Sequence, residues 1–197
     1  MIILEDIALR RGHKLLFSGA SASLQPGQKI AVIGGNGCGK SSLFALLLEE
    51  LQADAGGIRG LEGIRISHMA QETETSTLTA RDYVIAGDAA LFQTVQDLAS
   101  ANAAGDYEQS AMLHQRMEEL DGYSAERRAE QLLLGLGFQR EKMDAPMSAL
   151  SGGWRIRLNL ARALMAPSDL MLLDEPTNHL DLDTTLWLQT WLQRYRG

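Results

Sequence analysis

The sequence predicts an α/β fold, in which helices pack on a mixed or parallel β-sheet and a helical subdomain is inserted. Two short apolar segments, residues 29–33 and 170–173, have the length and composition of buried strands. The first continues into a glycine-rich loop and the second into two adjacent carboxylates. Between them, residues 81–147 hold 12 acidic and 6 basic side chains and few Gly or Pro, which indicates a helical insert.

The composition is that of an ordinary globular protein. Of the 197 residues 45% are hydrophobic and 22% are charged, which excludes wholesale disorder. The one cysteine, Cys38, cannot form an intramolecular disulfide. No apolar run approaches the ~20 residues of a membrane span, and the N-terminus lacks a signal peptide, so we expect a cytoplasmic protein without membrane insertion. The net charge of −7 argues against generic nucleic-acid binding.

The first 69 residues are predicted to alternate strands and turns around one helix. We expect strands over residues 2–10, 29–33 and 64–69. Turns are expected at Pro26-Gly27 and at Gly56-Gly57. A helix follows the glycine-rich loop, because apolar residues recur there at helical spacing, at Leu43, Leu46, Leu47 and Leu51.

The remaining residues are predicted to be mainly helical. Residues 80–103 and 107–120 form a helical hairpin that turns at Gly105-Asp106. Ser124 is expected to cap a helix that runs to residue 136. Two further helices are expected over 154–165 and 184–195, on either side of the apolar strand at 170–173.

The glycine-rich loop matches a phosphate-binding pattern. Gly34-x4-Gly39-Lys40-Ser41 fits G-x-x-x-x-G-K-[ST] and lies between a predicted strand and a predicted helix. Such a loop turns its backbone N–H groups towards phosphate oxygens, and the helix dipole adds positive potential. Lys40 is expected to reach the β- and γ-phosphates, and Ser41 to offer its hydroxyl to Mg²⁺. The candidate ligand-binding residues here are Gly34, Gly35, Asn36, Gly37, Cys38, Gly39, Lys40, Ser41 and Ser42.

Two carboxylates follow the second apolar strand. Ligands bind at the carboxyl ends of strands in open parallel sheets, which is where Asp174 and Glu175 are predicted to lie. Asp174 is expected to hold Mg²⁺, directly or through water. Glu175 is expected to polarise an attacking water as a general base. Without the phosphate loop, a solvated pair of carboxylates would explain these residues equally well.

A second candidate anion site begins a helix. Leu150-Ser151-Gly152-Gly153 places a hydroxyl and flexible backbone at the predicted N-terminus. A domain with one phosphate loop has no local use for this second site. Ser151, Gly152 and Gly153 are therefore expected to cap the γ-phosphate of a nucleotide that another domain holds.

These motifs resemble those of the ATP-binding cassette (ABC) superfamily over essentially the whole chain. They occur in that family's order: the loop at 34–41, Gln71, Leu150–Gly153, the strand end at 170–175 and Asn178-His179-Leu180-Asp181. Three stretches are similar to the ABC-F branch, and to the first cassette of its YheS-type members: Gly-Asn-Gly-Cys-Gly-Lys at 35–40, Ser-Gly-Gly-Trp-Arg-x-Arg-Leu at 151–158 and Asp-Glu-Pro-Thr-Asn-His-Leu-Asp at 174–181.

The resemblance implies a P-loop NTPase fold of the ABC type and hydrolysis of ATP to ADP and phosphate with Mg²⁺. It implies a nucleotide-binding core over 1–80 and 148–197, and a helical subdomain over 81–147 whose hairpin at about 83–121 is the branch's ribosome-contacting arm. A plain helical subdomain is the alternative. The expected partners are a second cassette and the ribosome. Because the insert is acidic, we expect it to contact ribosomal protein rather than phosphate.

Further roles come from the resemblance residue by residue. Gln71 is expected to bind Mg²⁺ and sense the attacking water, with a polar surface Gln as the alternative. Asp181 is expected to contact the opposite cassette. Arg11 stands where the family has the aromatic residue that stacks on adenine. An Arg can stack on a flat ring, but a solvated Arg explains the position equally well.

The sequence departs from a complete cassette at its end. The family continues into a further strand and a switch His, and this sequence stops at Gly197 before them. We therefore expect the chain alone to hydrolyse ATP weakly or not at all. Two other functions remain open, namely the ATP-binding subunit of a membrane transporter and a module that binds ATP without hydrolysing it. A single-turnover assay separates the last of these from an ATPase.

Overall fold

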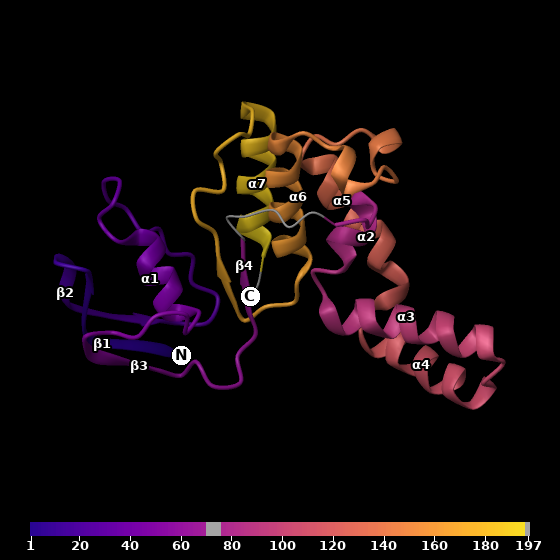
Figure 1. The fold of residues 1–197 in the computed structure, drawn as a ribbon, viewed down its shortest axis with the longest axis horizontal. Coiled ribbons are helices and arrows are strands. Elements are labelled where there is room, and N and C mark those ends of the chain that lie inside the picture. Colours follow the sequence, from indigo (N-terminus) through magenta and orange to yellow (C-terminus); the bar gives the residue numbers. More distant parts are fainter. Residues whose placement is uncertain (70–75, 196–197) are drawn as a thin grey trace. The chain divides into compact units, whose positions relative to one another are not determined.

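A computed structural model describes residues 1–69 and 76–195, which form two compact units (Figure 1). The first, here called the β unit, comprises residues 1–67 and 168–174. The second, the helical unit, comprises the described residues of 68–167 and 175–195. Within the described residues no helix combines the length and the apolar character needed to cross a membrane.

The β unit contains two small sheets and one helix. Strand β1 (Ile2–Arg11) lies between β2 (Lys14–Leu24) and β3 (Ala55–Arg59), and both pairings are antiparallel. Strands β4 (Ile66–His68) and β5 (Leu170–Leu172) form the second sheet. Helix α1 (Lys40–Leu47) follows the glycine-rich loop. Their apolar side chains build one core, from Ile2, Leu4, Ile7, Leu9, Leu46, Leu47 and Leu172.

The core face of β1 changes its spacing in the middle of the strand. Ile2 and Leu4 alternate inward, but the next buried residue is Ile7, three positions on. Asp6 has a φ of 48°, and the pairing register with β2 and with β3 shifts at this point. An extra residue in a strand produces this combination, because it moves the later side chains to the opposite face.

The helical unit is built almost entirely from helices. These are α2 (Ala80–Ile85), α3 (Ala89–Ala104), α4 (Tyr107–Glu119), α5 (Ala125–Gly135), α6 (Gly152–Met165) and α7 (Leu182–Arg194), with single 3₁₀ turns at Gly122–Ser124, Arg140–Lys142 and Met147–Ala149. Helices α3 and α4 lie side by side as a hairpin, while α5 packs against α2, α6 and α7 (Figure 1). Inside, the Tyr83 hydroxyl donates to Asn159 Oδ1 at 2.7 Å, and Arg162 Cζ lies 4.7 Å from the Tyr83 ring centre.

Several predicted elements are confirmed. The strand at the N-terminus, the helix after the glycine-rich loop and the last three helices all form within a few residues of their expected bounds. The hairpin turns at Gly105-Asp106 as expected, but its first arm, predicted as one helix over 80–103, is divided into α2 and α3, because α2 ends at Ile85 and Asp88 caps a new helix. Ser124 precedes α5 as predicted, but the prediction that it caps the helix is wrong. Its hydroxyl makes no capping hydrogen bond to α5, whose residues are all described, and instead donates to the Asp121 carboxylate at 2.5 Å. The expected strands over 64–69 and 170–173 form, shortened to three residues each.

Two predictions about the β unit are wrong. Residues 29–33 do not form a strand, and they are not buried, since Ile33 is 92% exposed. Neither sheet of the described residues includes this segment, and a lone strand has nothing to satisfy its backbone groups. Gly56-Gly57 is not a turn but part of β3, because the positive φ of Gly56 lets its backbone lie against the irregular stretch of β1.

Candidate functional site

The glycine-rich loop is held in its turn by backbone conformations that favour glycine. Gly37 has a φ of 71° and Gly39 a φ of 112°. A Cβ on Gly39 would also lie 3.1 Å from the Phe17 ring and 3.2 Å from Leu16 Cβ, so β2 packs closely on the start of α1. These contacts fix where the loop passes into the helix and direct the first N–H groups of α1 towards the loop.

Two lysines hold carbonyl groups of this loop. Lys40, the first residue of α1, donates through Nζ to Gly34 O at 3.0 Å and to Gly35 O at 3.3 Å. Lys14, the first residue of β2, donates through Nζ to Gly37 O at 3.1 Å. The Lys40 side chain therefore lies over its own loop. This is where a phosphate-binding lysine is expected, because the loop is predicted to surround the phosphates. Lys14 was not among the residues expected to serve the loop.

The loop and the acidic strand end meet in the β unit. The Ser41 hydroxyl donates to Asp174 Oδ2, although 133 residues separate the two in sequence. The apolar residues of α1 and β5 share the core, which brings Ser41 and Asp174 together at the ends of these elements. A hydroxyl and a carboxylate are hard oxygen ligands of the kind that Mg²⁺ prefers, so these residues fit that ion.

Glu175, which follows Asp174 in the chain, has an unusual backbone. Its φ is 48°, a left-handed conformation that costs a non-glycine residue free energy. Asn178 restrains it twice: its Nδ2 donates to Glu175 Oε2 at 2.6 Å, and its N–H donates to Glu175 O at 3.0 Å. Asn178 thus orients the expected general base, a role that the sequence reasoning missed and that its position three residues later makes possible.

The second candidate anion site begins α6 in the helical unit. Ser151 occupies the residue before the helix, with extended backbone, and its hydroxyl makes no capping bond to the described residues of α6. Gly152 and Gly153 are exposed, and a Cβ on either would meet nothing within 4 Å. The first N–H groups of α6 therefore lie on an open surface, as binding to a ligand from another domain would require.

Arg157, one turn into α6, connects this helix with two other segments. Its side chain, only 14% exposed, donates to Leu136 O at 3.0 Å, to His179 O at 3.1 Å and to Asp181 Oδ2 at 3.2 Å. Its Cζ also lies 5.0 Å from the Trp154 ring centre. The guanidinium thereby fixes the start of α6 to the end of α5 and to the loop before α7.

Asp181 caps the last helix. Its Oδ1 accepts from Thr184 N at 2.9 Å. This backbone hydrogen bond, together with the Arg157 guanidinium, lowers the pKa of Asp181 to about 2 from its usual 3.8. Trp154 packs within the helical unit, with the centres of its ring and the Phe138 ring 4.6 Å apart in an edge-to-face arrangement. Thus Trp154 and Asp181 have structural contacts within their own unit.

The remaining candidates lie at separate places. Arg11 ends β1 and is exposed, and Cys38 is exposed within the loop. Gln71 lies outside the described residues, so its expected contact with Mg²⁺ stays a prediction. The structure therefore brings together the loop and Asp174 in the β unit, and Glu175 with Asn178 in the helical unit.

Comparison with known sequences gives matches along the whole chain. The sequence profile of the ABC transporter family matches residues 17–178. The chain is 49% identical over 197 residues to YheS of Haemophilus influenzae and 45% identical to YheS of Escherichia coli K12. Each match takes in the whole of this chain and 31% of the relative. It is 35% identical over 200 residues to ATP-binding cassette sub-family F member 3 of Homo sapiens, covering 98% of this chain and 27% of that protein.

The chain therefore spans about a third of the length of these relatives. Solved structures share its fold. An ABC transporter ATP-binding protein from Pyrococcus furiosus superposes with a TM-score of 0.69 at 16% identity, covering 100% of this chain and 87% of that one. A metal-chelate-type ABC transporter in an inward-facing conformation gives 0.62 at 24% identity, over 98% and 66%. This likeness confirms the predicted α/β fold class.

Proposed function

The chain belongs to the ATP-binding cassette family, and from this premise we propose that it is the first cassette of a two-cassette ABC-F ATPase that acts on ribosomes. Family membership makes it an ATP-binding domain of the ABC type. The ribosomal role is supported by the similarity to an F-subfamily protein and to YheS along essentially the whole chain. The observation that carries the ATPase proposal is the contact of Ser41 with Asp174 beside the phosphate loop.

In this proposal the β unit binds the nucleotide. The residues 34–42 surround the triphosphate with backbone N–H groups, and Lys40 places its charge on the β- and γ-phosphates. Ser41, Gln71 and Asp174 hold Mg²⁺, which neutralises phosphate charge when it is bound. Glu175, oriented by Asn178, accepts the proton of the attacking water. Catalysis then consists mainly of positioning and charge stabilisation.

A second cassette completes the site. We assign Ser151, Gly152 and Gly153 to the γ-phosphate of ATP held by that cassette, because the open N-terminus of α6 has no phosphate loop in its own unit. Asp181 follows as a contact to the same partner. Closure of the two cassettes on ATP, and their reopening after hydrolysis, would be the movement that does work.

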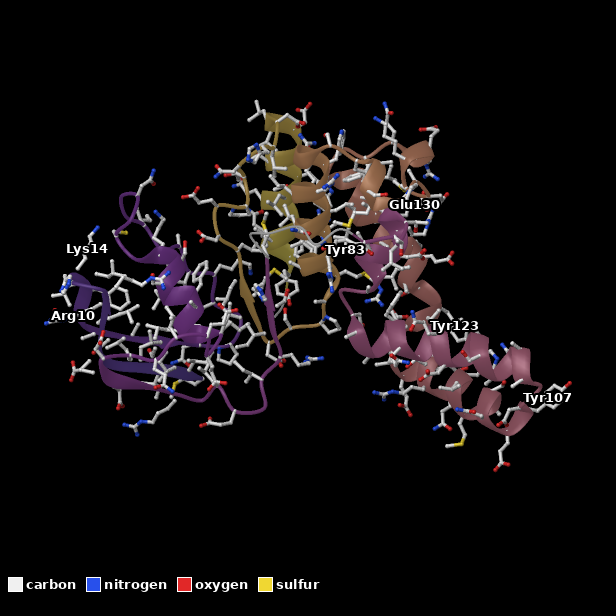
Figure 2. The ribbon with its side chains drawn as sticks, in the orientation of Figure 1. Arg10, Lys14, Tyr83, Tyr107, Tyr123 and Glu130 are labelled. Atoms are coloured by element: carbon white, nitrogen blue, oxygen red, sulfur yellow. The ribbon has the colours of Figure 1, made fainter. Side chains whose placement is uncertain are left out.

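The helical subdomain over 81–147 is proposed to carry the contact with the ribosome. Two aromatic side chains are exposed to solvent here: Tyr107, the first residue of α4, is 87% exposed, and Tyr123, in the 3₁₀ turn that follows the hairpin of α3 and α4, is 62% exposed (Figure 2). The hairpin is our candidate for the arm expected at about 83–121. Because the subdomain is acidic, we assign it a protein surface of the ribosome. Such a partner places the protein in the cytoplasm.

The ATPase proposal is tested by single-turnover hydrolysis with the chain in excess over ATP. We expect slow, Mg²⁺-dependent release of phosphate that Glu175→Gln reduces at least tenfold, since a general base contributes on the order of 10²–10⁴ in rate. Glu118→Gln, on the exposed side of α4, serves as the matched control. Binding of ATP with no hydrolysis by the unaltered chain would identify a binding module instead.

The ribosomal proposal is tested by co-sedimentation of the chain with purified ribosomes. We expect a fraction to pellet with ribosomes, and we expect Tyr107→Ala together with Tyr123→Ala to reduce that fraction. Deletion of the exposed side chain of Leu186, through Leu186→Ala, is the control, because this residue is half-exposed on α7. Pelleting with membrane vesicles and not with ribosomes would favour a transporter subunit.

A further inference from the structure

The hairpin of β1 and β2 brings a lysine to the phosphate loop from outside the loop motif. Lys14 Nζ donates to Gly37 O at 3.1 Å across 23 residues of sequence. A Cβ built on Gly37 would lie 3.9 Å from the same nitrogen. Figure 2 labels Lys14 between β2 and the loop that precedes α1. The second half of the loop is therefore held by a cation, as Lys40 holds the first half.

The strand register shows which face of the hairpin meets the loop. Arg11 pairs with Lys14, and Arg10 pairs with Leu15. Side chains of directly paired residues share a face, and consecutive residues alternate. Arg11 and Lys14 thus lie on the face that contacts the loop, whereas Arg10 lies on the other.

Residues further along β2 support this assignment. The register shifts after Leu15, and Leu16 and Phe17 both lie against the position of Gly39, at 3.2 Å and 3.1 Å from a Cβ built there. One face of β2 therefore lines the loop from Gly37 to Gly39. Lys14 stands at the outer end of this contact, where its ammonium group is exposed to solvent.

We propose that Lys14 is a second nucleotide-binding lysine of the phosphate loop, donating to the phosphate groups of a nucleoside triphosphate bound there. An ammonium group has three N–H donors in a flexible arrangement, so it can hold Gly37 O and a phosphate oxygen together. The inference rests on the proposed function, in which residues 34–42 bind ATP. It assigns part of the affinity for phosphate to the hairpin instead of to the loop motif.

The test is titration of the 197-residue chain with Mg²⁺-ATP by calorimetry, at about 50 mM and about 500 mM salt. We expect Lys14→Ala to weaken binding on the order of tenfold at low salt, because a charge-assisted hydrogen bond is lost. The loss should shrink at high salt, since exposed charges are screened over a few ångströms there. Lys14→Arg should retain most of the affinity. Arg10→Ala removes the same charge from the opposite face and should leave affinity unchanged.

The outcomes separate the inference from the function on which it rests. Absence of binding by the unaltered chain would overturn both. ATP binding that Lys14→Ala leaves unchanged would overturn the inference alone. A loss of affinity that is equal at both salt concentrations and that Lys14→Arg does not restore would also overturn it, because Lys14 would then act only by shaping the loop. Thermal unfolding of each variant, followed by circular dichroism, verifies that the compared chains are folded.

Discussion

Arg157 Nη2 lies 3.2 Å from Asp181 Oδ2, and this pair joins the helix that starts at Ser151 to the loop that precedes α7. Both segments are ones that we assign to contacts with a second cassette. The Arg157 side chain is nearly buried, and the same guanidinium also holds Leu136 O and His179 O. Movement of one segment is therefore mechanically linked to the other within the helical unit.

The first prediction concerns this guanidinium. We expect Arg157→Ala to lower the free energy of unfolding by about 2–4 kcal/mol, because it leaves two carbonyl groups and a carboxylate without their buried donor. Urea denaturation followed by tryptophan fluorescence measures the change. The exposed Arg127→Ala in α5 is the control and should alter stability by less than about 0.5 kcal/mol. Equal stability of the two variants would contradict the linking role of Arg157.

A second prediction concerns the close approach of α5 and α7. A Cβ on Gly135 would lie 1.9 Å from Trp187 Cε2, so Gly135→Ala must displace the indole ring. Alanine favours a helix over glycine by about 1 kcal/mol, but overpacking costs about 1–3 kcal/mol. We expect a net loss of stability in thermal unfolding. Gly57→Ala, where a Cβ meets nothing within 4 Å, provides the comparison, and a stabilised Gly135→Ala would refute the packing argument.

A third prediction concerns acid stability of the β unit. Arg65 donates twice through its side chain and once through its N–H to Asp169, which lowers the pKa of Asp169 to about 2 from 3.8. A lowered folded-state pKa stabilises the fold above the unfolded pKa, and this stabilisation is lost as the pH falls through about 2.

We therefore expect Asp169→Asn to be less stable than the parent at pH 6 and to approach it near pH 2. Urea denaturation at several pH values measures this, with Glu62→Gln as the exposed control. Asp181 has a shift in the same direction, so the pH dependence should decrease without disappearing. A difference between Asp169→Asn and the parent that stays constant from pH 6 to pH 2 would show that the charge of Asp169 contributes nothing.

The fourth prediction concerns the metal. If Ser41 and Asp174 hold Mg²⁺, then Ser41→Ala and Asp174→Asn should each reduce the factor by which Mg²⁺ strengthens ATP binding, by about tenfold. Titration with ATP in Mg²⁺ and in EDTA gives this factor. Ser100→Ala on α3, whose exposed hydroxyl donates to Gln96 O one turn earlier, should leave it unchanged. An unaltered factor in both site variants would remove these residues from the metal site.

The short motifs could be predicted from sequence because each is local. The phosphate loop needs glycine at Gly39 for its positive φ, and the pattern specifies that glycine directly, whereas Gly37, also at positive φ, occupies one of its variable positions. The helices after Gly39 and after Ser151 were likewise visible in apolar spacing and in their N-terminal residues. The contact of Ser41 with Asp174 agrees with the rule that ligands bind at the carboxyl ends of parallel strands. The strand predicted before the loop, however, did not form.

Two of the missed features depend on partners distant in sequence. Lys14 carries no motif, and only the register of β1 with β2 turns it towards Gly37. Gly56 looked like a turn residue, whereas its freedom serves a close approach to β1 within a strand. For Lys14 and Gly56 a tertiary neighbour decided between two local options. Ser124 precedes a helix as expected, but its hydroxyl donates to the carboxylate of Asp121, a local partner three residues earlier.

If a strand paired with the exposed segment at residues 29–33, that pairing and nucleotide binding would be linked. The segment leads directly into the phosphate loop, and within the described residues neither sheet includes it. A strand that paired with it would fix where the loop begins. If pairing favours the loop geometry that binds nucleotide, nucleotide must favour pairing by the same factor, because coupled equilibria are reciprocal. The free energy by which ATP strengthens strand pairing at residues 29–33 would then equal the free energy by which that pairing strengthens ATP binding.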